Sequence, residues 1–464
     1  MQKLTMFSKV LLFLTAVAIT GTLLLYIGSF HADKDGETVR AANAATTSIN
    51  DQNPPLAAAT TETGGKFVIA FDEWHGWKAI IDANKGINSG QSDSIFKTLG
   101  LDVEIAVIND DEESLQKFIS GEVMAIAMTV NRWANVHARL PESIGARMIL
   151  VTDRSAGGNG IVTTADISGI EGLYGHIIAV SKYTSAHVMT EYLLKNSNLS
   201  QVQIDEIRNS MILTNSAAES LDKLVDGEAD VASFWEPYLT QAYNLLGVKT
   251  LFSTKVATNL VMGGVIVRED YLNNYPDLTE KFVEGTFRAV NEYKDEFAYI
   301  RELDEYANLS DTEIIEMADL VLFADFADNR DLFDGTIQDL YTGMADVWAS
   351  LGMNTVTNGS QTAFDSSFIL NVASKFSDNR VSTPVLANTD MGRPVQQEDT
   401  NTLLSRHLTI NFEPNVAVIS EDSYPDLEEF AQVARLLNGA IIQVEGNIAD
   451  TGSGNTEFGK LLSE

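Results

Sequence analysis

The clearest pattern of apolar and polar positions in this chain occurs twice. Residues 114–127 (SLQKFISGEVMAIA) and residues 220–232 (SLDKLVDGEADVA) each carry apolar side chains at helical spacing, then a glycine, then a short apolar run. This spacing predicts a helix ended by a left-handed Gly121 or Gly227, followed by a strand. Such units are typical of parallel α/β sheets. We therefore expect two similar lobes, in preference to a chance likeness between two ordinary α/β units.

Other apolar runs predict the remaining elements. Strands are expected at residues 66–71, 101–107, 172–180 and 263–267. A further strand is expected at 148–151, and residues 161–162 resume it after a glycine-rich loop. Residues 278–293 and 336–351 have the spacing of amphipathic helices. Because open α/β sheets present ligand groups beyond the carboxyl ends of their strands, we expect a site in the residues that follow the strands.

Those residues are rich in aromatic and hydroxyl groups. Trp74 and Trp77 follow the first predicted strand, and their indoles would suit either a core or a ligand wall. Residues 153–160 contain successive glycines, which can offer backbone N–H groups to an anion, although a plain loop is the favoured interpretation. Residues 181–185, of which all but Lys182 carry a hydroxyl, begin a predicted helix, where the hydroxyls cap it and could also hold an anionic group.

Composition narrows the classes of function. A net charge of -34, from 65 acidic against 31 basic residues, argues against nucleic-acid binding. The absence of cysteine removes disulfides, thiol catalysis and cysteine-held metals. The sequence lacks the common metalloprotease, serine-hydrolase and nucleotide-binding motifs, and its histidines show no metal-ligand spacing, so we expect neither an enzyme nor a cofactor.

The first residues indicate the compartment. Residues 10–30 contain no charged residue and follow Lys3 and Lys9, which predicts a membrane-spanning helix whose following chain lies outside the cytoplasm. A cleaved signal peptide is the alternative, and the length of the run favours an uncleaved anchor. Residues 31–65 have no apolar periodicity and predict a flexible linker.

The order of these segments resembles the substrate-binding proteins of ABC importers, in the nitrate, taurine, alkanesulfonate and thiamine-precursor group. The matching stretches are 74–77 (WHGW), 101–103, 114–127, 153–157, 181–187, 235–237 (WEP) and 364–368. The resemblance implies an α/β, two-lobed periplasmic-binding-protein type II fold over residues 66–395, with the second lobe at about 168–262 and a small solute held between the lobes. By this resemblance the positions facing the cleft are Trp74, Trp77, Thr129, Asp153, Ser155, Tyr183, Thr184, Ser185, Trp235 and Glu236.

The chemistry of the solute has two interpretations at this stage. Hydroxyls and loop amides would suit a small oxyanion, with Arg154 or Lys182 as the candidate clamp. Tryptophans beside Asp153 and Glu236 would suit a cation or an aromatic heterocycle, which is the favoured interpretation. The resemblance also implies an ABC permease and its ATPase as partners. A pyrimidine synthase that resembles the same family uses a cysteine-containing motif that this chain lacks.

Residues 396–464 resemble part of an outer-membrane-protein-A-like, peptidoglycan-binding domain. The similar stretches are 406–414, a helix over 424–437 and residues 440–453, which together predict a β-α-β fragment. The family's wall-binding aspartate falls on Ala449, beside Asp450, and the sequence ends before the position of the partner arginine.

From the two resemblances together we expect an extracytoplasmic importer component. The alternative is an envelope-tethered scaffold or sensor directed to the cell wall.

Overall fold

Two β-sheets organise the computed structural model, which describes residues 66–88, 92–141, 143–293, 297–376, 404–411 and 419–438. The strand order is β11-β4-β10-β3-β1-β2 in the first sheet and β7-β6-β8-β5-β9 in the second. The strands of the first sheet are β1 (Lys66–Phe71), β2 (Asp102–Val107), β3 (Ala125–Thr129), β4 (Ala146–Ser155), β10 (Met262–Arg268) and β11 (Val321–Phe323). The strands of the second sheet are β5 (Asn159–Thr163), β6 (Ile178–Ser181), β7 (Ile212–Thr214), β8 (Val231–Trp235) and β9 (Lys249–Ser253).

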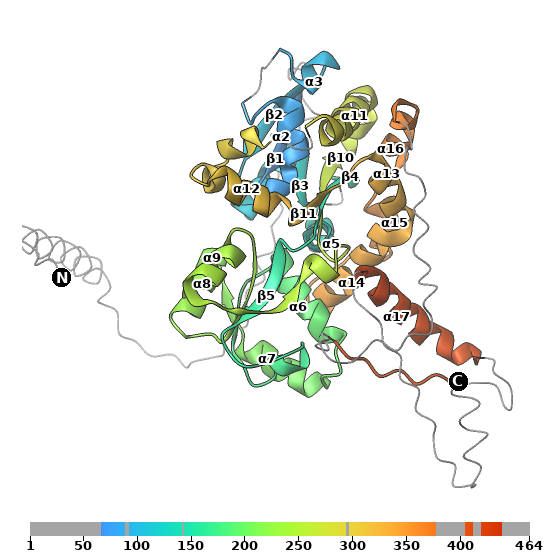
Figure 1. The fold of residues 1–464 in the computed structure, drawn as a ribbon. Helices are drawn as coiled ribbons and strands as arrows, with labels where there is room; N and C mark the ends of the chain where they lie inside the picture. Colours follow the sequence, from blue (N-terminus) through green and yellow to red (C-terminus); the bar gives the residue numbers. More distant parts are fainter. Residues whose placement is uncertain are drawn as a thin grey trace, which may run out of the picture. The chain divides into compact units, whose positions relative to one another are not determined.

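Helices pack around each sheet and complete two α/β lobes (Figure 1). Those of the first lobe are α2 (Lys78–Asn84), α3 (Ile95–Thr98), α4 (Asp111–Ser120), α5 (Val130–Val136), α10 (Glu269–Asn274), α11 (Pro276–Glu292), α12 (Asp311–Ala318), α13 (Phe326–Asp331) and α16 (Ser367–Val372). Those of the second lobe are α6 (Ser185–Lys195), α7 (Gln201–Ser210), α8 (Ala217–Val225) and α9 (Tyr238–Leu246). Two further helices follow, α14 (Ile337–Ser350) and α15 (Gly359–Thr362). The bounds of α11 and α14 confirm the two amphipathic helices expected from the sequence.

Both helix–glycine–strand units form as predicted. Helix α4 ends at Gly121, which has a φ of 79°, and β3 then pairs in parallel with β1. Helix α8 is followed by Gly227, with a φ of 70°, and β8 pairs in parallel with β6. A left-handed φ favours glycine because a Cβ atom would crowd the neighbouring carbonyl, which explains the residue type at both positions.

One predicted strand is divided between the two sheets. Strand β4 pairs with β10 in the first sheet, whereas β5 pairs with β8 and β9 in the second. The glycine-rich loop is therefore a crossing segment between the lobes, and the second sheet begins at Asn159 rather than near residue 168. A short strand that the sequence did not predict, β11, adds to the edge of the first sheet beside β4. Apolar runs cannot show which sheet a strand joins, which is the physical reason that the division between β4 and β5 was missed.

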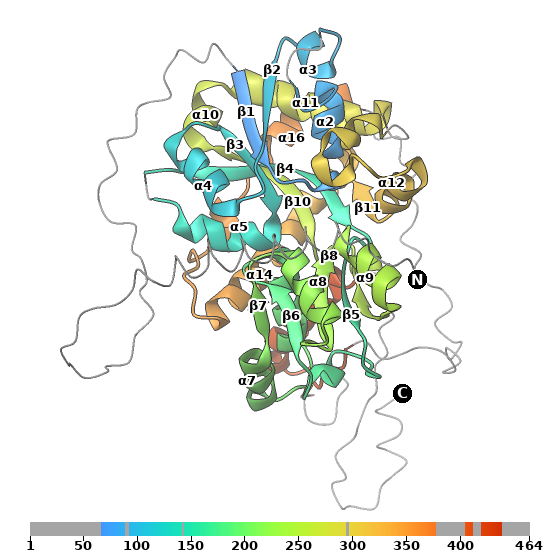
Figure 2. The ribbon, with the colours of Figure 1, turned by 90° about the vertical axis from the view of Figure 1, so that its left-hand side faces the viewer.

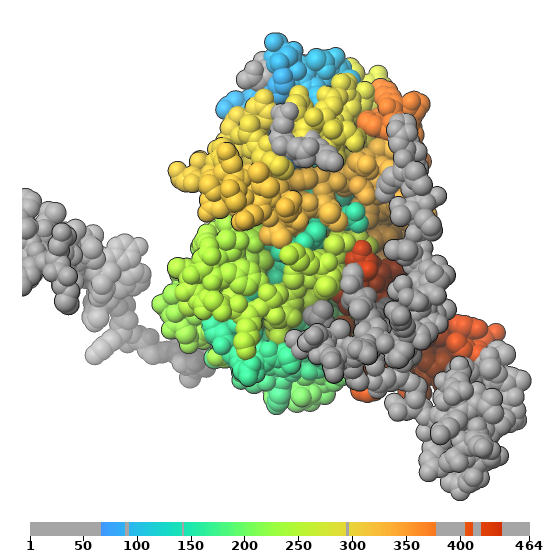
Figure 3. Space-filling view, in the orientation of Figure 1, coloured from blue at the N-terminus to red at the C-terminus, as the bar shows by residue number. Residues whose placement is uncertain are grey.

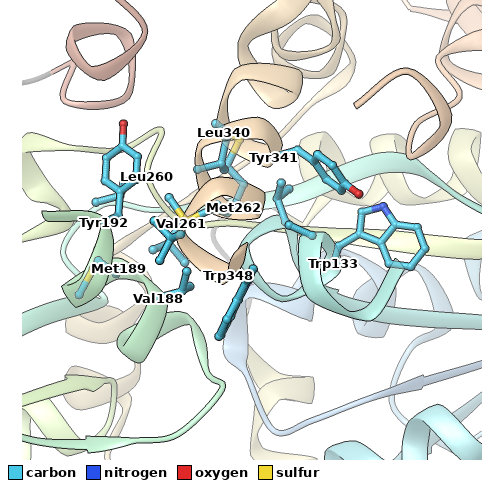
Figure 4. Close-up of a cluster of buried hydrophobic side chains, with 14 of the residues drawn as sticks. Trp133, Val188, Met189, Tyr192, Leu260, Val261, Met262, Leu340, Tyr341 and Trp348 are labelled. Carbon is cyan, nitrogen blue, oxygen red and sulfur yellow. The ribbon is translucent and has the colours of Figure 1, made fainter. Parts of the chain in front are cut away.

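A shared apolar core lies where the lobes meet. Residues 254–261, which lead from β9 back to β10, form the returning crossing segment between the lobes. The core includes Trp133 of α5, Val188 of α6, Leu260 of this segment, and Leu340 and Trp348 of α14, all completely buried (Figure 4). Helix α14 packs against both α5 and α6, so it contacts one helix of each lobe (Figure 1). Figure 2 shows α14 beside α5, at the level where the two sheets meet. The two lobes therefore share one apolar core, to which α14 contributes beside a helix of each lobe.

The C-terminal prediction is only partly correct. Helix α17 (Tyr424–Leu436) matches the expected helix, but residues 404–411 form neither helix nor strand, so the predicted first strand of a β-α-β unit is absent from that described stretch. Residues 440–464 and the expected membrane helix at 10–30 lie outside the described residues. Among the described helices, none is both long and apolar enough to span a bilayer.

Candidate functional site

In the first lobe, the candidate site contains an indole hydrogen-bonded to a buried carboxylate, and we call this pair the first wall. Trp74 lies in the turn after β1, and its Nε1 donates to Oδ1 of Asp153 on β4 at 3.1 Å. Asp153 is 2% exposed, and Thr152 donates to its other oxygen at 2.8 Å. Burial raises the pKa of Asp153 to about 6, and the negative charge of Asp72 adds to this effect, while the two hydrogen bonds oppose it.

Two glycines make room for this pair. A Cβ atom on Gly76 would lie 2.1 Å from Nε1 of Trp74 and 2.5 Å from Cγ of Asp153. A Cβ atom on Gly263 would lie 2.2 Å from Oδ2 of Asp153. Neither position tolerates a side chain without displacing the carboxylate, so close packing fixes the orientation of Asp153.

The second lobe also contains a tryptophan beside a buried acid, and we call this pair the second wall. Trp235 ends β8 and is half-buried, and the adjacent Glu236 is 3% exposed. The carboxylate of Glu236 accepts from the backbone N–H of Thr240 at 3.1 Å and from its hydroxyl at 3.2 Å. Burial raises the pKa of Glu236, and both hydrogen bonds oppose the shift. Each lobe thus presents one tryptophan and one buried acid.

Gly158, in the first crossing segment, brings the two walls together. Its carbonyl oxygen accepts from the backbone N–H of Glu236 at 2.9 Å. A Cβ atom on Gly158 would lie 2.9 Å from Cη2 of Trp74, so the indole rests on this glycine. We call Trp74, Asp153, Gly158, Trp235 and Glu236 the interlobe site.

The lobes also touch beside this site. The hydroxyl of Tyr238, on α9, donates to Oε1 of Glu305 in the first lobe at 3.3 Å. Burial raises the pKa of Glu305, and the charges of Glu73 and Asp72 raise it further. Figure 3 shows the yellow and orange chain of the first lobe meeting the green chain of the second. The region around the interlobe site is therefore rich in carboxylates.

Several predicted site residues have structural partners instead of open surface. Trp77 is 1% exposed and donates to Asp72 at 2.7 Å. Ser155 is 1% exposed, and its hydroxyl contacts that of Thr254 at 2.8 Å. Thr129 accepts from the N–H of Arg132 and so caps α5. These three side chains are occupied by the fold in this structure.

The remaining predicted site residues, Tyr183, Thr184 and Ser185, lie at the start of α6. Thr184 caps the helix by accepting from the N–H of His187, as predicted, and Ser185 is its buried first residue. Tyr183 has a φ of 63° and a 51% exposed side chain, and its N–H donates to Nδ1 of His187 at 3.2 Å. That bond needs a lone pair on Nδ1, and burial lowers the pKa of His187 to about 4, which keeps the imidazole neutral.

Trp348 is a neighbour of this turn that the sequence did not reveal. Its ring centroid lies 6.4 Å from that of Tyr183 and 6.1 Å from that of His187. Its Nε1 donates to the carbonyl oxygen of Asn131 on α5 at 2.8 Å, so one side chain links the two lobes. The amphipathic pattern of α14 predicts burial of Trp348, but no local signal predicts these partners.

The structure does not support the anion interpretation of the glycine-rich loop. The N–H groups of Ala156 and Gly158 donate to the carbonyl of Leu320 at 2.8 and 3.2 Å, and that of Gly157 donates to Thr254 at 2.9 Å. These donors are already satisfied within the protein, and an anion would have to displace their partners.

Of the two candidate clamp residues, Arg154 is engaged by other side chains. Arg154 donates to Asn259 at 3.2 Å and to Asp328 at 3.4 Å, and Lys182 is exposed. A cavity of about 10 Å³ beside Asp72 has room for about one water molecule, not for a solute. In the described part of the chain, no group of three or more acidic or histidine side chains is arranged to hold a metal ion.

Comparisons with known proteins show the fold. No protein-family model and no curated protein matches the sequence. The periplasmic aliphatic sulphonate-binding protein SsuA from Escherichia coli has a similar structure, with a TM-score of 0.52 at 13% identity, covering 64% of this chain and 97% of that one. A sulfonate-binding protein described as putative, from Methylobacillus flagellatus, gives 0.52 at 16% identity, covering 67% and 95%.

A third similar structure is the ligand-binding component of an ABC-type import system from Staphylococcus aureus, with zinc bound. Its TM-score is 0.50 at 13% identity, covering 66% of this chain and 97% of that one. At these identities the likeness shows the fold alone: this chain has the two-lobed, type II periplasmic-binding-protein fold.

Proposed function

We propose that this protein is the extracytoplasmic solute-binding component of an ABC importer, which takes a small solute between its lobes and delivers it to a permease. The observation that carries the proposal is the matched pair of walls in the interlobe site. Each wall places an indole and a buried acid at the junction of the lobes, where a solute can bridge them. The contacts that we propose are Trp74, Asp153, Tyr183, Trp235 and Glu236.

The preferred solute in this proposal is a small organic cation, such as a protonated amine. Asp153 and Glu236 are buried with raised pKa values, and their hydrogen-bond partners on the described chain are neutral. A cation would pair with both carboxylates and stack on the indoles. A sulfonate or nitrate would instead meet two like charges, without Arg154 to offset them.

Binding of a solute panel to the purified protein tests this proposal. Thermal shift and calorimetry would compare small primary and quaternary amines and pyrimidine precursors with taurine, alkanesulfonates and nitrate. We expect one amine to raise the unfolding temperature, because a ligand that binds only the folded state stabilises it. A response confined to the anions would refute the cation class while keeping the binding function.

Two substitutions separate site residues from general charge. Asp153→Asn and Glu236→Gln should each weaken amine binding about tenfold or more, because each removes a buried ionic partner. Asp222→Asn, on the exposed face of α8, is the matched control and should leave binding unchanged. Equal effects of all three would mean that only net charge matters.

Localisation and partners remain part of the proposal. The expected membrane helix at residues 10–30 would hold the lobes outside the cytoplasm, and membrane fractionation of the full chain with and without these residues tests this. We do not include wall binding, because the described residues 404–411, where the resemblance to that module begins, form neither helix nor strand.

A further inference from the structure

Helix α17 docks on the apolar core that the two lobes share. Val433 and Leu436 are 5% and 1% exposed within that cluster, and Leu404 and Leu437 pack against its edge. Burial of leucine and valine side chains of this kind stabilises the docked position of the helix. The helix is therefore held to the body of the protein by its C-terminal turns.

Polar contacts fix these turns to the returning crossing segment. Nδ2 of Asn259 donates to the carbonyl oxygen of Arg435 at 3.1 Å, and Nδ2 of Asn438 donates to Oγ1 of Thr258 at 2.9 Å. Asn259 also accepts from Arg154 near the end of β4, so it contacts the strand that leads into the first crossing segment. The guanidinium of Arg435 pairs with Asp339 of α14 at 2.7 Å.

The preceding stretch is attached to the second lobe. Ser405 accepts from Nδ2 of Asn198 at 2.6 Å, and its N–H donates to Glu171 at 3.1 Å. Arg406 donates to Asn196, at the end of α6, at 3.1 Å and to Glu429 of α17 at 2.8 Å. Residues 404–411 and α17, which we call the C-terminal brace, thus contact the second lobe, α14 and the crossing segment together.

We propose that the C-terminal brace restrains the hinge and sets the equilibrium between lobe arrangements from outside the interlobe site. Opening or closing a two-lobed protein changes the backbone of its crossing segments, and here such a change must break or rebuild the contacts of Thr258 and Asn259 with the brace. Whatever stabilises one lobe arrangement also changes the affinity for a solute that prefers it.

Distances between the lobes test the brace directly. The chain has no cysteine, so Gln116→Cys on α4 and Asp222→Cys on α8 provide two unique attachment points for spin labels, one per lobe. Pulsed electron resonance would give the distance distribution of the parent, of Leu436→Asp, which undocks α17, and of Glu428→Ala, an exposed control on the same helix. We expect a broader or shifted distribution for Leu436→Asp alone.

A milder variant keeps the test valid if Leu436→Asp unfolds the protein. Arg435→Ala combined with Asn438→Ala removes surface contacts only and should shift the distribution in the same direction. An unchanged distribution in a folded variant whose α17 has become protease-sensitive would overturn the proposal. The distance measurement needs no solute, so failure of the proposed transport function would leave this result standing. If a solute is found, its affinity should change about fivefold or more in the same variants.

Discussion

Replacing Asp153 with asparagine should stabilise the protein at neutral pH and weaken solute binding. In the folded state, burial raises the pKa of Asp153 from 3.8 to about 6. An asparagine has nearly the same shape, can still accept from Nε1 of Trp74 and can donate to the hydroxyl of Thr152. The substitution therefore removes the cost of a buried charge and keeps the local packing.

The pKa difference sets the magnitude. Between pH 3.8 and about 6 the folded protein keeps this proton while the unfolded chain releases it, so stability falls as the pH rises through that window. At about 1.4 kcal/mol per unit, the loss reaches about 3 kcal/mol above pH 6 and vanishes below pH 4. Asp153→Asn should recover up to this amount at pH 7.5 and almost nothing at pH 4.

Urea unfolding at the two pH values measures the effect. The free energy of unfolding of Asp153→Asn would be compared with that of the parent and of Asp222→Asn, which alters an exposed acid. A higher free energy of unfolding at pH 7.5 alone would support the interpretation that the buried carboxylate of Asp153 is charged at neutral pH, at a cost in stability, because it serves binding. A loss of stability at pH 7.5, or the same change at both pH values, would refute the reasoning.

Three further substitutions probe the geometry around the site. Gly76→Ala should destabilise the fold by about 1–3 kcal/mol in urea unfolding, because its Cβ would overlap Trp74. Gly172→Ala is the control and should cost less, because its Cβ would lie 3.3 Å from Cβ of Ile167. Thr254→Val should speed hydrogen exchange in the crossing segment, since its hydroxyl accepts two backbone N–H groups there; unchanged exchange would contradict this. Trp348→Phe should lower the free energy of unfolding by about 1 kcal/mol by losing the bond to Asn131, and no loss would show that bond to be unimportant.

Local patterns predicted much of the fold because they depend on residues close in sequence. The two helix–glycine–strand units, the cap at Thr184 and the bounds of α11 and α14 follow from helical spacing, a left-handed glycine or a short polar side chain. The division of one predicted strand into β4 and β5 could not be foreseen, because β-sheet membership depends on partners far away in the chain. The strand expected within residues 406–414 is absent from the described residues 406–411 for a related reason. Arg406 contacts Asn196 and Glu429, and Asn411 contacts Ser420 and Ser423, so their partners are not in a strand.

The amino-acid pattern alone is enough to predict that two similar α/β units follow each other and that aromatic and acidic residues lie at the ends of their strands. The roles of those residues depend on contacts between segments that are far apart in the chain. Trp74 meets Asp153 because β1 and β4 share a sheet, while Trp77 and Ser155 turn to internal partners. The raised pKa of Asp153 likewise depends on burial by distant segments, since desolvation is a property of the packed protein and not of the residue.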